Sequence, residues 1–367
     1  MNGTIYMPVG EVCSSISDTY REKKNMVTLI NTSDVLEGRV LNHERVPNSN
    51  LKGQFKKTFQ RDDILYSEIR PQNRRFAYVD FSPIDYIAST KLMVIRAKKD
   101  VVSPKYLYYF LKNSSTVAEL QLLAETRSGT FPQITFSEVA NLTIPVPSLA
   151  VQEVIVQTMQ CLEDKITCNE QINDNLQQQA QAIYSSMFID NHDPAWSHGH
   201  LSDLITVKYG KDHKKLADGI YPVYGSGGIM RYVERPLYNK ESVLIPRKGT
   251  LNNVMYVNQP FWSVDTMFYT EMKLPNVAKF VYHFVKAKDL ASMNAGSAVP
   301  SMTTDILNAM EVVIPSASAL EEFESLVAPM YEAMEANDVQ SKALSQMRDT
   351  LLPKLMSGEI DVSDVQL

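Results

Sequence analysis

Two stretches of this sequence follow one plan. Residues 129–148 read GTFPQITFSEVANLTIPVPS, and residues 296–316 read GSAVPSMTTDILNAMEVVIPS. The segment NLTIPVPS alternates apolar residues with a period of two, which predicts a strand, and its prolines predict an edge strand or a strand end. Because the same approach, strand and exit occur twice, the sequence predicts two copies of one structural unit.

The repeat extends well beyond these stretches. A shift of 168 residues places Pro132–Phe188 on Pro300–Met356 without a gap, with few identities but with matched apolar positions. Upstream the match continues with gaps, so that DDILYSEIRP resembles ESVLIPRKG and PKYLYYFLK resembles VAKFVYHFVK. Each copy is therefore predicted to contain several short strands, a helix at Tyr106–Lys112 or Phe280–Lys286, and the proline-bounded strand.

A long helix is predicted after each of these strands. Apolar residues recur at alternating steps of four and three, which is the heptad pattern of a helix-helix seam. Asn169 and Asn337 fall at the same position of the two seams, where a buried polar residue lowers stability but fixes register. Each stripe could pack on its own domain, but two matching seams favour an antiparallel pair. The predicted pairing residues are Leu162, Ile166, Asn169, Leu176 and Ile183 on one helix, and Met330, Met334, Asn337, Leu344 and Leu351 on the other.

Two prolines lie inside the second helical pattern. Pro329 and Pro353 lack the amide hydrogen that an interior helical residue donates, so we expect a kink or a restart at each.

The composition is that of an ordinary globular protein. The 367 residues predict about two domains, and 44% are hydrophobic and 21% charged. No apolar run reaches the ~20 residues that a membrane span needs, and the first residues do not read as a signal peptide. Three cysteines without a CxxC pair favour a reduced, cytoplasmic location.

Basic residues cluster in short stretches of this acidic chain. The helical regions carry most of the negative charge, because residues 316–367 alone hold ten acidic and three basic side chains. Two loops, EIRPQNRR and IPRKGTLNN, follow equivalent predicted strands, and Arg, Lys, Asn and Gln can read base edges in the DNA major groove. A solvated polar loop is the alternative for each. The residues predicted to contact DNA are Arg70, Gln72, Arg74, Arg75, Arg247, Lys248, Asn252 and Asn253.

Motifs for catalysis or metal binding do not emerge from the sequence. There is no GxxxxGK[ST], GxGxxG or GxSxG motif, and no base-methylating motif of the Asn-Pro-Pro-Tyr kind. The glycines of YGSGG, residues 224–228, predict a tight turn, and the His198–His200 pair lacks further residues at metal-ligand spacing. We therefore predict neither a catalytic residue nor a metal site.

The sequence resembles the specificity subunits of type I restriction–modification systems. Residues 131–188, from FPQITFSEV to IYSSMF, are similar to the central conserved region of that family, and residues 307–360 are similar to its distal region. GIYPVYGSGGIMRYV, followed by VLIPRKGTLNNVMYVNQPFWSVDTMFY, is similar to a target recognition domain. The resemblance is looser over residues 1–60.

The resemblance implies an α+β fold with two tandem mixed α/β recognition domains, separated by two long antiparallel helices in a coiled coil with pseudo-two-fold symmetry. It implies recognition domains at 1–147 and 190–315, a central spacer helix at 148–189, and a distal helix and tail at 316–367. Each domain then reads half of a split site in double-stranded DNA.

Partners and cofactors follow from the same resemblance. Modification subunits are expected to bind this chain, carry S-adenosylmethionine and methylate the DNA, so the chain itself needs no cofactor. A restriction and motor subunit can join them, and no membrane is involved. Two other hypotheses stay open: a coiled-coil scaffold that has lost DNA binding, and the DNA-reading subunit of a related restriction system with a fused nuclease–methylase partner.

Overall fold

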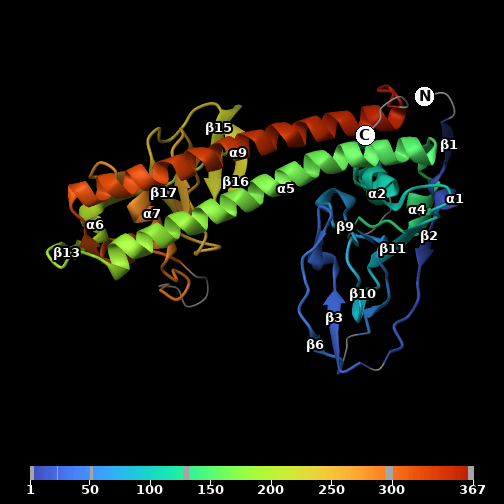
Figure 1. The fold of residues 1–367 in the computed structure, drawn as a ribbon, viewed down its shortest axis with the longest axis horizontal. Helices are drawn as coiled ribbons and strands as arrows, with labels where there is room; N and C mark the ends of the chain where they lie inside the picture. Colours follow the sequence, from blue (N-terminus) through green and yellow to red (C-terminus); the bar gives the residue numbers. More distant parts are fainter. Residues whose placement is uncertain (1–3, 23, 50–52, 127–131, 294–300, 363–367) are drawn as a thin grey trace. The chain divides into compact units, whose positions relative to one another are not determined.

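The computed structural model describes residues 4–22, 24–49, 53–126, 132–293 and 301–362. Its contacts divide the chain into two compact units (Figure 1). Unit 1 comprises residues 1–168 and 339–367, and unit 2 comprises residues 169–338. Both boundaries fall inside the two long helices, so each unit contains one domain and a part of each helix.

Unit 1 contains a mixed α/β domain with two four-stranded sheets. The first sheet has the order β2-β11-β8-β9 and is antiparallel throughout, and the second has the order β6-β3-β10-β7. Strand β1 pairs with β12, whose Pro145 lies opposite Tyr6, as expected for a proline in an edge strand. The strands are β1 Ile5–Pro8, β2 Cys13–Ile16, β3 Met26–Ile30, β4 Val35–Leu36, β5 Arg39–Val40, β6 Val46–Pro47, β7 Phe55–Lys57, β8 Ile64–Ser67, β9 Phe76–Tyr78, β10 Tyr86–Ser89, β11 Leu92–Ala97 and β12 Thr143–Val146.

Unit 2 repeats this plan. Its main sheet has the order β14-β20-β17-β18, and β13 pairs with β21 as β1 pairs with β12. A second sheet of three strands has the order β16-β15-β19. The strands are β13 Ser197–His200, β14 Ile205–Tyr209, β15 Asp218–Gly225, β16 Gly228–Val233, β17 Ser242–Pro246, β18 Met255–Val257, β19 Trp262–Ser263, β20 Met267–Met272 and β21 Glu311–Ile314.

The helices occupy equivalent places in the two units, which confirms the repeat. The predicted Tyr106–Lys112 and Phe280–Lys286 segments are the helices α2 and α7, and nearly all their residues are buried. Both helices present aromatic side chains to the cores of their units. The shorter helices are α1 Val9–Val12, α2 Pro104–Lys112, α3 Ser114–Thr126, α4 Phe136–Asn141, α6 Leu201–Leu204, α7 Ala278–Lys286 and α8 Thr304–Asn308, with 3₁₀ turns η1 Thr32–Asp34 and η2 Pro71–Asn73.

The two long helices are α5, Leu149–Ser185, and α9, Ala317–Ser357. A π-helical turn, η3 Ser186–Asp190, follows α5 directly. At ~1.5 Å per residue, the 37 residues of α5 extend over about 55 Å. The expected restart in the second helix is wrong, because α9 passes Pro329 and Pro353 without interruption. Both prolines are exposed, and buried residues on either side of each anchor the helix to its unit.

Within each unit the parts of α5 and α9 lie side by side and run antiparallel (Figure 1). In unit 2 the amide of Asn169 donates to the carbonyl of Asn337 at 3.4 Å, and Asn173 donates to the carbonyl of Met334 at 3.3 Å. Further along, the rings of Tyr184 and Phe323 are 6.2 Å apart. In unit 1 Glu163 lies 3.9 Å from Arg348. Residue numbers therefore fall along one helix as they rise along the other.

The residues predicted for the helix seam are only partly covered. Asn169 is buried and the other nine are half-buried. Leu162 and Leu351 pack against the core of unit 1, whereas Ile183, Met330 and Met334 pack against the core of unit 2. Each helix thus buries its apolar stripe against a domain as well as along the helix pair.

A matched pair of substitutions on α9 tests this packing. Phe323 is fully buried among the rings of Tyr184 and Phe188, whereas Leu326, one turn later, is 47% exposed. Phe323→Ala is expected to lower the unfolding free energy of unit 2 by about 3–5 kcal/mol, because it leaves a cavity. Leu326→Ala should change it by less than about 0.5 kcal/mol. Denaturant unfolding followed by circular dichroism measures both, and equal effects would contradict the packing described.

Candidate nucleic-acid interface

The predicted DNA-reading loop of unit 1 is built around two left-handed residues. Arg70 and Arg74 flank the turn η2 with φ of 45° and 52°, a conformation that is uncommon for residues other than glycine. The turn is tied to α3, because Gln121 accepts a hydrogen bond from the backbone amide of Gln72 at 3.2 Å. The side chains of Arg70 and Gln72 are exposed. They are the two members of the predicted set that face solvent here.

Arg74 and Arg75 of this loop have partners inside the domain. Arg74 forms an ion pair with Glu37 at 3.2 Å and donates to the carbonyl of Lys112 at 3.3 Å. Arg75 donates to the carbonyl of Ser33 at 3.0 Å. In the structure, therefore, these two guanidinium groups hold the loop against its own domain.

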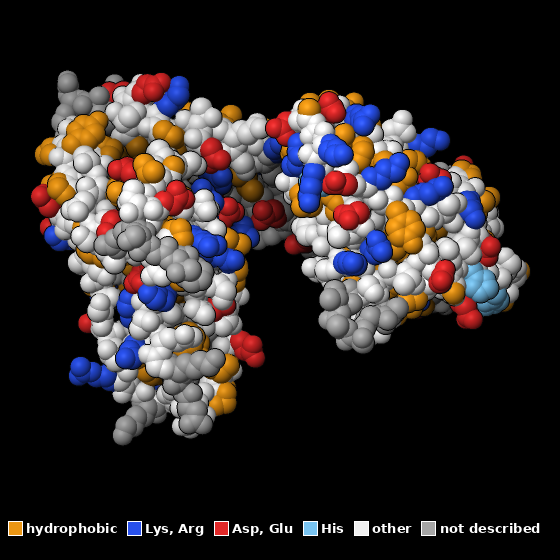
Figure 2. Space-filling view, turned by 180° about the vertical axis from the view of Figure 1, so that it is seen from behind, with side chains coloured by type: hydrophobic (Ala, Val, Ile, Leu, Met, Phe, Trp, Pro, Cys, Tyr) orange, Lys and Arg blue, Asp and Glu red, His pale blue; other side chains and the backbone are white. Residues whose placement is uncertain are grey.

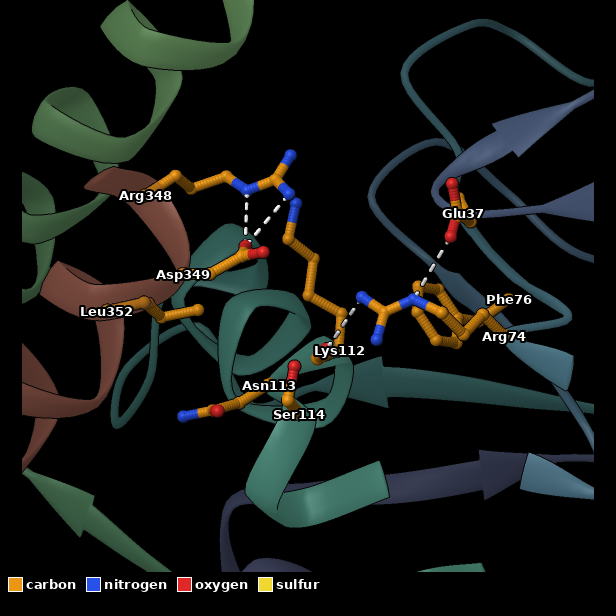
Figure 3. A pocket seen from close by; sticks show the side chains of 9 residues that line it. All are labelled: Glu37, Arg74, Phe76, Lys112, Asn113, Ser114, Arg348, Asp349 and Leu352. Atoms are coloured by element: carbon orange, nitrogen blue, oxygen red, sulfur yellow. Dashed lines mark hydrogen bonds and ion pairs between the residues drawn. The ribbon is translucent and has the colours of Figure 1, made fainter. Parts of the chain in front are cut away.

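A pocket of about 300 Å³ lies beside Arg74 (Figure 3). Arg74 enters it from the end of the turn η2, Lys112 and Asn113 from the end of α2, and Arg348 and Asp349 from α9. The remaining lining residues are Glu37, Phe76, Ser114 and Leu352. The lining holds three cations, Arg74, Lys112 and Arg348, and two carboxylates, Glu37 and Asp349. Lys112 is also paired with Glu163, so most of the positive charge is compensated.

The pocket adjoins the junction between α2 and the long helices. The buried Lys112 ammonium forms an ion pair with Glu163 of α5, and Tyr109 donates to the same carboxylate at 2.9 Å. Burial lowers the pKa of Lys112, while the charge of Glu163 acts in the opposite direction. Burial and the Glu163 carboxylate both raise the pKa of Tyr109. A charged pair thus joins domain and helix in unit 1.

At the position equivalent to Glu163, the contact in unit 2 is between neutral groups, although the buried Lys279 of α7 also forms an ion pair with Glu324 of α9 at 2.6 Å. The 168-residue shift places Tyr331 at the position of Glu163, and Tyr331 contacts Nε2 of His283 at 3.0 Å. The other ring nitrogen of His283 lies 2.8 Å from the side-chain oxygen of Gln181 on α5. His283 is fully buried, and burial lowers its pKa to about 4. The imidazole is therefore neutral near pH 7 and connects α7 to both long helices.

In the predicted loop of unit 2, residues 247–253, some side chains likewise bind other residues of the same unit. Asn252 donates to Asp289 at 3.0 Å, and Asn253 donates to the carbonyl of Ser226 at 2.8 Å. Arg247 lies over the ring of Tyr209, 5.3 Å from its centre, and Lys248 is exposed. The loop therefore braces the turn at residues 225–228 while presenting Arg247 and Lys248 near the surface.

The turn at Gly225–Gly228 closes the hairpin formed by β15 and β16, which confirms the tight turn predicted from YGSGG. Lys and Arg side chains gather on one face of unit 2, with apolar side chains among them (Figure 2). The sequence prediction did not include this hairpin or Tyr209 as part of an interface. The signal that could have found the hairpin is the run of apolar residues beside Arg231 in YGSGGIMRYV.

Neither a metal-binding cluster nor a membrane-spanning helix is found among the described residues. No group of three or more His, Cys, Asp or Glu in the described part of the chain could hold a metal ion. Among the same residues, no helix has the length and apolar character needed to cross a membrane.

Comparison with known proteins identifies the family. The model of the type I restriction modification DNA specificity domain matches residues 6–178 and 195–323. These two matches cover most of the chain, which therefore belongs to this family. They correspond to two target recognition domains, and the chain is a non-catalytic specificity subunit of a type I restriction–modification system.

Curated relatives and solved structures agree with this assignment. The HindI specificity subunit of Haemophilus influenzae is 27% identical over 91% of this chain and 94% of its own length. The MjaIX specificity subunit of Methanocaldococcus jannaschii is 25% identical over 77% of each chain. The crystal structure of a type I system S subunit from M. genitalium has a TM-score of 0.57 with 18% identity over 97% of each chain, which supports the predicted fold class.

The buried histidine makes the stability of unit 2 depend on pH. Because the pKa of His283 is about 4 in the folded chain and near 6.5 when exposed, the unfolded state binds an extra proton between these values. Stability should therefore fall as the pH decreases from about 6.5 to 4, by roughly 3 kcal/mol for this group.

The substitution His283→Gln removes the titrating ring. It should lower stability at pH 8, where hydrogen bonds and packing are lost, and flatten the decline between pH 6.5 and 4. Urea midpoints at several pH values measure both effects. His192→Gln, at an exposed position, is the control and should retain the wild-type profile. An unchanged slope in His283→Gln would show that other groups cause the decline.

Proposed function

We propose that each unit of this specificity subunit reads one half of a bipartite site in double-stranded DNA, and that the long helices set the distance between the halves. The observation that carries this proposal is the repeated strand order of the two units, each attached to the helix that follows its proline-bounded strand. Tandem readers on one spacer fit two half-sites, as dimeric DNA-binding proteins do.

The modification subunits are proposed to dock on this chain and to carry S-adenosylmethionine and the methylating residues, and a restriction and motor subunit can join them. One solved structure with the same fold, at TM-score 0.51 and 14% identity, comes from work on complex assembly of a type I restriction–modification system. The complex would act on DNA in the cytoplasm. The matched family favours this function over a coiled-coil scaffold that has lost DNA binding. Salt-dependent binding of DNA by the complex would exclude the scaffold.

Substitutions in the two loops test whether each unit reads its own half-site. Arg70 is exposed in unit 1 and Arg247 lies over Tyr209 in unit 2. A lost base contact typically costs ~1–3 kcal/mol and relaxes one position of a site, whereas a lost phosphate contact weakens all sequences alike. Arg70→Ala should therefore change one half of the methylated motif, and Arg247→Ala the other half.

The measurement is sequencing of methylated genomic DNA from cells that express each variant with its partner subunits. Lys165→Ala, an exposed substitution on the acidic helix α5, is the control and should leave the motif unchanged. If both arginine variants retain the wild-type motif and occupancy, the two loops do not contact DNA.

A second prediction concerns the cofactor. The purified chain alone should not bind S-adenosylmethionine, because its sequence lacks the motifs that would hold or use it. Isothermal titration calorimetry of the isolated chain, with the assembled complex as the positive control, measures this. Saturable binding to the isolated chain would show that part of the cofactor site belongs to this subunit.

A further inference from the structure

The hairpin of β15 and β16 presents apolar side chains to solvent. Tyr224 pairs with Ile229, but Val223 pairs with Arg231, so Met230 forms a bulge. Bulges redirect side chains and are frequent near functional sites. Ile229 is 49% exposed and Met230 is 61% exposed. Exposed apolar groups gathered on one hairpin indicate a contact with another molecule.

The tip of the hairpin is held firmly. A Cβ atom at Gly225 would lie 2.6 Å from the sulfur of Met230, and one at Gly249 would lie 2.6 Å from the hydroxyl of Ser226. Gly249 also has a φ of +86°, which other residues rarely adopt. The Gly249 approach and the bond from Asn253 to the carbonyl of Ser226 hold the turn against the 247–253 loop.

Basic loops adjoin the hairpin beside β16 and at its turn. Arg231 donates to the carbonyl of Leu216 at 3.0 Å, which places the loop with Lys211, Lys214 and Lys215 beside β16. At the turn, the 247–253 loop carries Arg247 and Lys248. Between residues 209 and 250 there are eight Lys and Arg residues and four Asp and Glu residues. The charge of this face is complementary to a polyanion (Figure 2).

We propose that the β15–β16 hairpin enters the major groove of the half-site read by unit 2, where Ile229 and Met230 contact thymine methyl groups. This inference rests on the proposed function and names the residues and the atoms that it uses. The major groove accepts a two-stranded ribbon, and its thymine methyls are the apolar groups that such side chains recognise. The flanking cations would contact phosphates on both sides of the groove.

Replacing thymine by deoxyuridine removes only the methyl group and keeps the base pair. The motif is first obtained by methylation sequencing with the wild-type chain and its modification subunits. Duplexes with this motif are then substituted in each half-site in turn, and the affinity of the complex is measured at fixed salt. We expect the wild-type affinity to fall about fourfold for each contacted methyl. This loss should be confined to one half-site.

The protein variants Ile229→Ala and Met230→Ala complete a double-mutant cycle. At least one of them should bind thymine and deoxyuridine duplexes equally well at the position where the wild type discriminates. Leu326→Ala on α9, which has similar exposure, is the matched control and should discriminate like the wild type. Both substituted residues are at the surface, and retained binding to the unsubstituted half-site shows that the variants fold.

Three results would overturn the inference: a wild type that does not sense the methyl, variants that sense it as strongly as the wild type, or a unit 2 half-site without an A·T pair. Loss of discrimination with binding retained cannot arise from a hairpin that contacts another protein. A wild-type complex that binds no DNA specifically would instead overturn the proposed function, and the inference with it.

Discussion

The fold depends on the two long helices being shared between the two units. Each helix leaves its own domain through a proline-bounded strand and continues into the unit of the other domain. The apolar stripe of α5 therefore contributes to both cores. Ile155 and Met159 lie in the core of unit 1, and Ala180 and Tyr184 lie in the core of unit 2. α9 is used in the same way, with the order of the units reversed. Neither domain completes its core without a segment that the other copy of the repeat supplies.

A polar layer lies where the helix segments pass from one unit to the other. Asn169 contacts Asn337, its own equivalent under the 168-residue shift, and Asn337 donates to Asn173 at 2.8 Å. Asn173 also donates to Asp338 at 2.8 Å, and burial raises the pKa of this carboxyl. Apolar residues here would bury more surface, but any sliding of one helix along the other would break these bonds. The layer therefore gives up some stability and disfavours other registers.

Much of the architecture could be predicted from the sequence because periodicity records burial. The strand before each long helix, the helices α2 and α7, and the extent of α5 and α9 all follow from spacing of apolar residues. The path of α9 through Pro329 and Pro353 did not follow from it, because local propensity cannot show that packing on both sides holds the helix. The partners of Arg74, Arg75 and Asn253 were also beyond the sequence. A loop rich in Arg and Asn looks the same whether its side chains bind a groove or brace the loop, since both uses need hydrogen-bond donors.

The two copies differ in chemistry where each domain meets the helix pair. In unit 1, Glu163 forms an ion pair with Lys112 and accepts a hydrogen bond from Tyr109. In unit 2, the equivalent residue Tyr331 makes a hydrogen-bond contact with His283. Placing the Lys112 side chain against a tyrosine would leave a buried ammonium without its carboxylate, which is costly. Placing His283 against a buried glutamate would favour the protonated ring and reverse the direction of its pKa shift. Each domain is therefore chemically matched to its own position on the helices, although the two positions are equivalent in the repeat.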